Sequence, residues 1–177
     1  MAIYPNYTAG QKLTAADLAA GQSIIVYKTA NTDRASTTTL TDDPELTVTL
    51  AAGAVYIIEF YLHYAAINAA QFKTAWTVPS GATGARSVRG LASTVSDSSS
   101  APTGGGAGSL RSGIHNYTTV INYGTRDSGT NQVLAREETL ITTSSAGTCA
   151  IQWAQVTSNA TATRMAAGSW VRALRIS

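Results

Sequence analysis

Apolar and polar residues alternate along most of the chain, which is the period of β-strands that bury one face. From residue 23 onward, runs rich in β-branched and aromatic residues are separated by clusters of turn-forming residues. These runs span 24–29, 35–40, 46–50, 54–64, 71–78, 114–122, 132–143, 148–156 and 168–176. Because no second helical pattern accompanies them, we predict an all-β fold, a jelly-roll-like antiparallel β-sandwich.

The run at 54–64, AVYIIEFYLHY, is apolar on both faces. One face carries Tyr56, Ile58, Phe60, Leu62 and Tyr64. The other carries Val55, Ile57, Glu59, Tyr61 and His63. Such a strand lies in the centre of a sheet that is covered on both sides, so we expect the first face in the core and the second against another subunit. In a monomer, the N-terminal arm or a Ser/Gly-rich loop would cover that second face instead.

The last run, 168–176, is also apolar on both sides, with Trp170 on one face and Val171 on the other. It therefore adds a second strand that can contribute to a subunit contact. The expected oligomer interface consists of Val55, Ile57, Tyr61, His63 and Val171.

Two segments lie outside the strand pattern. Residues 1–22 are expected to form an N-terminal arm ahead of a sandwich domain at 23–177, and Ser, Gly and Pro at about 93–109 predict a flexible loop. An arm with apolar and aromatic residues usually lies against another surface. The expected attachment residues are Ile3, Tyr4 and Tyr7.

One short helix is predicted within the arm, in the sequence QKLTAADLAAGQ. Thr14 can cap its first turn, and Asp17 stands three residues later to complete a capping-box pattern. Leu13 and Leu18 are spaced to form a hydrophobic staple around the cap, and Gly21 marks the end of the helix.

Composition narrows the class of protein. Charged residues make up 12% of the 177-residue chain, against roughly 25% in an average soluble protein. A surface this poor in charge fits a protein covered by copies of itself or by a larger assembly; a weakly charged secreted β-protein is the alternative. The net charge of +2, with scattered arginines, does not favour nucleic-acid binding. No apolar run is long enough to span a membrane, and the start has no signal-peptide pattern, so we expect synthesis in a cytoplasm.

No catalytic motif is present, so we expect neither enzymatic activity nor a cofactor. Cys149 lies in an apolar strand, where a small buried side chain is expected rather than a nucleophile. His63 and His115 lack metal-ligand spacing. Asp42 and Asp43, in TLTDDPEL, are expected first to form a turn, with a calcium site as the alternative for this pair.

Four stretches resemble a known family: AGQKLTAADLAAGQ, YKTANTDRASTTTLTDDPELTVTLAAGAVYIIEFYLHY, FKTAWTVPSGATG and IQWAQVTSNATATRMAAGSWVRALRI. Together they resemble small virion proteins of tailed phages infecting actinobacteria, usually labelled minor tail proteins. The likeness extends over 10–176, and its most specific parts are TLTDDPEL and the closing WAQ, TSNAT and GSW segments.

The resemblance implies a trimeric β-module on the virion surface, made in the host bacterial cytoplasm and without catalytic residues. Its implied partners are itself and other virion proteins of the capsid or tail, with a host cell-surface glycan as a further partner. It is compatible with a minor tail or host-contacting protein and with a capsid decoration or head fibre protein. The alternative function is a carbohydrate-binding module that stacks sugars on Trp76, Trp153 or Tyr117.

Overall fold

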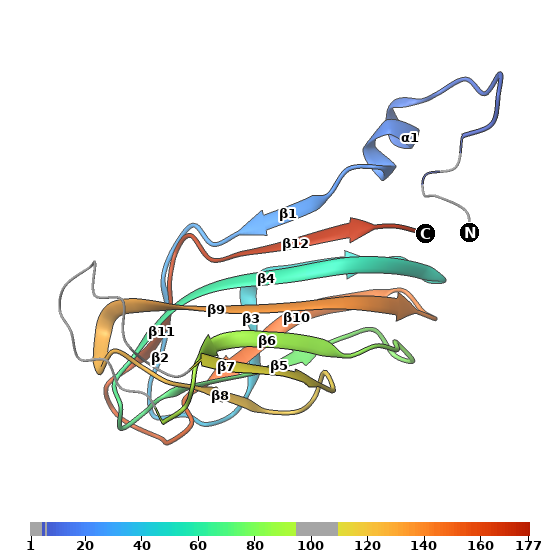
Figure 1. The fold of residues 1–177 in the computed structure, drawn as a ribbon. Helices are drawn as coiled ribbons and strands as arrows, with labels where there is room; N and C mark the ends of the chain where they lie inside the picture. Colours follow the sequence, from blue (N-terminus) through green and yellow to red (C-terminus); the bar gives the residue numbers. More distant parts are fainter. Residues whose placement is uncertain (1–4, 6, 95–109) are drawn as a thin grey trace.

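The structure is a computed structural model that describes residues 5, 7–94 and 110–177. Two β-sheets lie face to face, and a short helix stands beyond one end of them (Figure 1). In chain order the elements of the described residues are α1 (Ala15–Ala20), β1 (Ile24–Tyr27), β2 (Thr32–Arg34), β3 (Thr41–Leu50), β4 (Ala54–Ala66), β5 (Phe72–Thr77), β6 (Arg86–Leu91), β7 (Leu110–His115), β8 (Ile121–Tyr123), β9 (Ser128–Thr143), β10 (Gly147–Ala154), β11 (Thr163–Met165) and β12 (Trp170–Arg175).

The larger sheet has eight strands, with β1, β12, β4, β9, β6 and β7 in order and β2 and β11 joined at one end of β4. The smaller sheet has the order β3, β10, β5, β8. Every strand pair in both sheets is antiparallel. The prediction of an all-β antiparallel sandwich is therefore confirmed, while the jelly-roll connectivity and the trimer stay predictions.

The core lies between the two sheets and is built around β4, which pairs with β12 on one side and β9 on the other. The predicted inner face of β4 is buried as expected, with Ile58, Phe60 and Leu62 fully inaccessible. Aromatic rings join the layers: Phe60 meets Trp76 of β5 edge-on, with ring centroids 4.7 Å apart. Each such side chain contributes about 1.5–3 kcal/mol on removal from water, so this central strand contributes much of the stability.

Three strand predictions differ from the structure. Residues 35–40 form no strand, and β3 begins earlier than predicted, at Thr41, so that DDPE lies inside a strand rather than in a turn. The predicted run at 114–122 is divided between the end of β7 and the separate strand β8. The backbone N–H of Trp76 donates to the carbonyl of Tyr117, which lies between these two strands in the chain. The Tyr117 carbonyl therefore has a hydrogen-bond partner although it lies outside any regular strand pair.

The helix and its capping box are confirmed. The backbone N–H of Thr14 donates to Asp17 Oδ2 at 2.8 Å, and the backbone N–H of Asp17 donates to Thr14 Oγ1 at 3.2 Å. Tyr7 also holds the arm to the helix, because its hydroxyl donates to the Asp17 carbonyl at 2.7 Å. Of the predicted attachment residues, Ile3 and Tyr4 lie outside the described residues. The predicted loop at 93–109 falls there too, apart from its first two residues.

Replacing Thr14 with alanine should weaken α1 by about 1 kcal/mol, because the Asp17 amide loses its side-chain acceptor. Hydrogen exchange of the α1 backbone amides would measure this as faster exchange, with the sandwich strands unchanged. Thr38→Ala is the matched control, since Thr38 is exposed and lies outside the helix. Equal exchange in the two variants would contradict a stabilising cap.

Candidate functional site: the outer face of the large sheet and a buried lysine cluster

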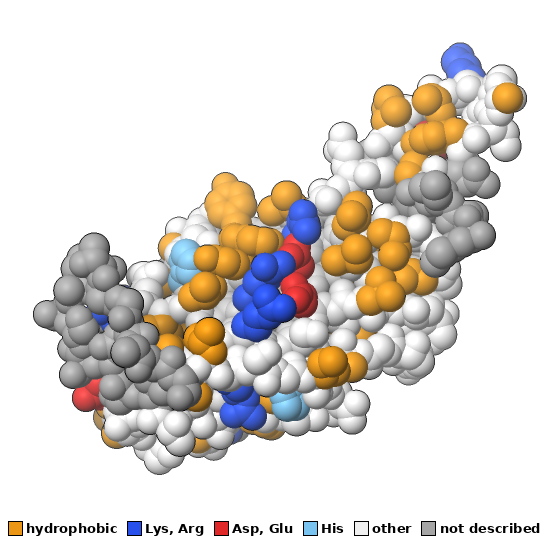
Figure 2. Space-filling view, in the orientation of Figure 1, with side chains coloured by type: hydrophobic (Ala, Val, Ile, Leu, Met, Phe, Trp, Pro, Cys, Tyr) orange, Lys and Arg blue, Asp and Glu red, His pale blue; other side chains and the backbone are white. Residues whose placement is uncertain are grey.

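The outer face of the eight-stranded sheet, turned away from the smaller sheet, is crossed by a row of charged side chains. Arg172 and Arg136 both pair with Glu59, and Arg136 Nη2 also lies 3.0 Å from Glu138 Oε2. Figure 2 shows this row of blue and red side chains with hydrophobic side chains on either side of it. Glu59 is only 7% exposed, since its two cations cover it. We call these four residues the charged row.

On one side of the charged row lies an aliphatic patch, made of Val55, Ile57, Leu140 and Leu174. The strand registers place Leu174, Ile57 and Leu140 side by side on β12, β4 and β9. Ile57 is 36% exposed and Leu140 is 57% exposed. A hollow of about 300 Å³ opens beside them, lined by Ile57, Ala85, Ser87, Glu138, Thr139 and Leu140. Large aliphatic side chains grouped on an exposed sheet are typical of a contact surface.

On the other side lies an aromatic patch, made of Tyr27, Tyr61, His63 and Trp170. Tyr61 and Trp170 stack with parallel rings whose centroids are 5.3 Å apart, and the His63 ring meets Tyr61 edge-on. Tyr27, on the edge strand β1, is 62% exposed. Partial burial lowers the pKa of His63, which favours its neutral imidazole form.

The structure places four of the five predicted interface residues on the outer face and the fifth in the core. Val55, Ile57, Tyr61 and His63 all lie on the outer face, as the alternation in β4 predicted. Val171 does not, because it pairs with Phe60 of β4 and is fully buried in the core. The outward residues of β12 are instead Trp170, Arg172 and Leu174, which sequence reasoning did not assign to the interface.

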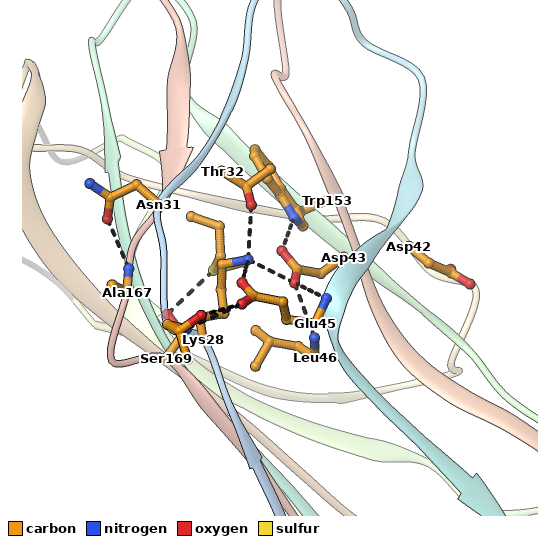
Figure 3. A network of polar contacts seen from close by, with 12 residues as sticks. Lys28, Asn31, Thr32, Asp42, Asp43, Glu45, Leu46, Trp153, Ala167 and Ser169 are labelled. Atoms are coloured by element: carbon orange, nitrogen blue, oxygen red, sulfur yellow. Dashed lines mark hydrogen bonds and ion pairs between the residues drawn. The ribbon is translucent and has the colours of Figure 1, made fainter.

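A buried lysine lies where the end of β1 meets β3, between the two sheets (Figure 3). Lys28 Nζ lies 3.0 Å from Asp43 Oδ1 and 2.8 Å from Glu45 Oε2, and it donates to Thr32 Oγ1 at 2.9 Å. The side chains of Lys28 and Asp43 are fully buried, while that of Glu45 is 30% exposed. We call Lys28, Asp43 and Glu45 the lysine cluster.

Asp43 receives further hydrogen bonds from the surrounding protein. Its Oδ1 accepts the backbone N–H groups of Glu45 and Leu46 at 3.0 and 3.1 Å. Its Oδ2 accepts the indole N–H of Trp153 at 2.9 Å. Glu45 is held as well, because its Oε1 accepts the backbone N–H and the hydroxyl of Thr29. The Lys28 ammonium, followed by these Thr29 bonds, lowers the pKa of Glu45, which favours its carboxylate form.

The predictions for Asp42 and Asp43 are corrected by this geometry. Neither residue forms a turn, since both lie in β3, where Asp43 points inward to Lys28. Asp42 points the other way and accepts the hydroxyl of Thr77 at 2.5 Å. The two carboxylates therefore do not converge on one cation, and among the described residues no three His, Cys, Asp or Glu side chains group as metal ligands would.

A second buried ion pair joins β6 to β9. Arg86 and Glu137 are both fully inaccessible and form a direct ion pair. Glu137 also accepts hydrogen bonds from Thr74 at 2.5 Å, from the indole N–H of Trp76 at 2.6 Å and from the hydroxyl of Tyr123 at 2.8 Å. Each of the two buried tryptophans thus donates to a carboxylate that has its own cation, Trp76 to Glu137 and Trp153 to Asp43.

The remaining candidate residues from the sequence lie in the core or at the end of a strand. Cys149 is buried, and burial raises the pKa of its thiol to about 12, so it stays protonated, as expected for a packing residue. His115 ends β7. The predicted sugar platform is wrong, because Trp76, Trp153 and Tyr117 are at most 6% exposed and belong to the core. No helix among the described residues is long and apolar enough to span a membrane.

The fold and its surface define an all-β sandwich with two buried ionic clusters and a partly apolar outer face. No protein-family model matches the chain, and no curated protein matches it. Among solved structures, a chain from the structure of infectious bursal disease virus, Gt strain, is 8% identical, with a TM-score of 0.19. The match covers 88% of this chain and 39% of that chain, and at this score it carries no argument about fold or function.

Proposed function

We propose that the protein is a non-enzymatic structural component of a phage virion, a β-sandwich that associates with itself as a trimer on the particle surface. The observation that carries the proposal is the outer face of the large sheet, where aliphatic and aromatic patches lie exposed on a central strand. The resemblance of the sequence to small virion proteins of actinobacterial phages supports the same assignment.

The charges on the outer face do not oppose burial in a subunit contact. Glu59 already has two arginine partners, and Arg136 bridges Glu59 and Glu138 within one chain. Covering charges that are already paired costs less than covering isolated ones. Exposed leucine and isoleucine gain about 25 cal/mol for each Å² removed from water. The aliphatic patch is therefore the centre of the proposed contact, and the charged row helps to set its register.

Replacing Ile57 with lysine should dissociate the oligomer into folded monomers. The new ammonium group would be buried in the contact beside carboxylates that Arg136 and Arg172 already pair, at a cost of several kcal/mol. Light scattering on the full chain would measure the molecular mass in solution. The matched control is Thr49→Lys, which adds the same charge to an exposed position on β3, in the other sheet. A monomeric wild-type protein, or an Ile57→Lys variant of unchanged mass, would contradict the proposed interface.

The virion assignment has its own test. Electron microscopy of the intact particle, with the chain located by a specific antibody, is expected to show it on the outer surface. A position on the tail would make it a minor tail or host-contacting protein, and a position on the head would make it a decoration or head fibre protein. A particle without the chain on its surface would overturn the assignment even if the chain is a trimer in solution.

A further inference from the structure

We propose that the folded chain joins Lys28 to Asp43 through an amide bond, and that Glu45 transfers the protons in this reaction. The inference goes beyond the proposed function and does not depend on it. It rests on an amine, a carboxyl group and a second carboxylate that three separate positions of the chain bring into contact.

The first requirement is an amine held against a carboxyl group and shielded from water. Lys28 Nζ lies 3.0 Å from Asp43 Oδ1, and neither side chain is exposed. Fixing two reactants at this separation replaces an encounter in solution by a step within one molecule, worth effective molarities of about 10⁵ M or more in well-oriented cases. The reaction also needs an uncharged amine and an uncharged carboxyl group. Moving one proton from Nζ to the carboxylate within the buried pair supplies both uncharged groups.

The second requirement is stabilisation of the negative charge that develops on the carboxyl oxygen when the amine attacks. Asp43 Oδ1 already accepts the backbone N–H groups of Glu45 and Leu46, at 3.0 and 3.1 Å. Two fixed N–H donors directed at one oxygen form the arrangement that holds an oxyanion in acyl-transfer enzymes. The backbone of β3 therefore supplies this stabilisation without any further side chain.

The third requirement is a group that moves protons from the amine to the departing oxygen. Glu45 Oε2 lies 2.8 Å from Lys28 Nζ, within hydrogen-bonding reach of the protons to be transferred. Thr29 fixes the other oxygen of Glu45 and so orients the carboxylate toward the amine. Because the Glu45 side chain is 30% exposed, it also marks the side on which a released water reaches the solvent.

The bonds and protons balance without a further reactant. The Nζ lone pair forms a bond to Asp43 Cγ, and the carbonyl electron pair moves onto Oδ1. Glu45 takes a proton from the nitrogen. Oδ2 received the first Nζ proton before the attack. When the electron pair returns from Oδ1, the bond from Cγ to Oδ2 breaks, Glu45 passes the second proton to Oδ2, and Oδ2 leaves as water. One ammonium and one carboxylate become one amide and one water, and Glu45 ends in the form in which it began.

The bond would tie the edge of the sandwich to its other layer. β1 has four residues and pairs with β12, and Lys28 directly follows it. Asp43 lies on β3, which belongs to the smaller sheet. An amide bond between them would fasten the edge strand, and the arm that precedes it, to both sheets. The other buried ion pair has no such chemistry, because the Arg86 guanidinium keeps its charge and is not a nucleophile under these conditions.

Mass spectrometry of the full chain under denaturing conditions tests the proposal. The expected mass is lower than the sequence mass by one water. Trypsin cuts after Arg34, which separates the peptide 13–34, carrying Lys28, from the peptide 35–73, carrying Asp43. These two peptides should appear joined, with no cleavage after Lys28. An intact chain of full mass would overturn the proposal, and so would a loss of water found within a single peptide.

Variants separate the roles of the three side chains. Lys28→Arg keeps a positive charge but cannot form this bond, so it should show the full sequence mass. Glu45→Gln should remain folded by near-ultraviolet circular dichroism while forming the linked species at least tenfold more slowly. The matched control is Asp42→Asn, which changes the neighbouring carboxylate that points away from Lys28 and should still lose one water. Linkage in Glu45→Gln at the wild-type rate would overturn the proton-transfer role, and linkage in Lys28→Arg would exclude Lys28 as the amine.

Discussion

Replacing Arg86 with methionine should lower the free energy of unfolding by about 3–5 kcal/mol, because it leaves the buried Glu137 carboxylate without its cation. Three donors would remain on Glu137, from Thr74, Trp76 and Tyr123, but each is neutral. Arg86 also donates to the carbonyls of Thr74 and Thr119, which would lose this partner. Urea denaturation followed by tryptophan fluorescence would measure the change as a lower midpoint.

Arg164→Met is the matched control for this substitution. Arg164 forms a two-contact pair with Asp33, at 2.7 and 2.8 Å, but both side chains are partly exposed. Exposed pairs contribute about 0–1 kcal/mol, so the control should unfold near the wild-type midpoint. A similar small effect for Arg86→Met would contradict the prediction and show that the buried ion pair contributes little to the free energy of unfolding.

The buried ion pairs show where sequence reasoning reached its limit. Charged residues are rarely fully buried unless they are paired, so a charge in a strand is most simply assigned to the wet face. Arg86 lies in RSVRGL, which was not predicted as a strand at all, and its partner is 51 residues away. The ion pair forms between β6 and β9 of one sheet, and Trp76 donates to it from β5 of the other sheet. The three residues therefore come together only in the packed sandwich.

The lysine cluster shows a different limit. Asp, Asp and Pro in sequence favour a turn by local chemistry, since Asp bonds its own following backbone and Pro fixes φ. Those local bonds do form, from Asp43 Oδ1 to the amides of Glu45 and Leu46, but inside a strand. The ammonium of Lys28 favours this arrangement by pairing with the buried Asp43. A contact between residues distant in sequence therefore outweighed a correct local signal.

The outer face could be predicted in part. The alternation of β4 separated its two faces correctly, because the period of a strand needs no tertiary information. The same alternation in β12 separated Val171 from Trp170, but the prediction that Val171 lies in the outer interface was wrong. The structure places Val171 inward, beside Phe60, and stacks Trp170 on Tyr61 outside. Large aromatic side chains on an outer sheet face are typical of contact surfaces.

Replacing Gly84 with alanine should lower the free energy of unfolding by about 2–5 kcal/mol, from backbone strain together with overpacking. Gly84 has a φ of 133°, in the region that favours glycine. A Cβ there would lie 2.4 Å from Tyr117 Oη and 2.5 Å from the Leu140 carbonyl oxygen. The Leu140 carbonyl belongs to the backbone of β9, so it cannot move aside as a flexible side chain would.

Gly53→Ala is a reference variant at a glycine with a positive φ and no contact for a Cβ. Gly53 also has a positive φ, of 61°, but a Cβ at this position would meet nothing within 4 Å. It should therefore cost only the backbone strain, about 1–2 kcal/mol. Urea denaturation of both variants would measure the difference, which combines the contact with β9 and the greater strain of a φ of 133° compared with 61°. Ala85 and Leu140 line the hollow beside Ile57. An unchanged free energy of unfolding in Gly84→Ala would therefore mean that the segment before β6 can move away from β9. The hollow would then not be a fixed feature of the outer face.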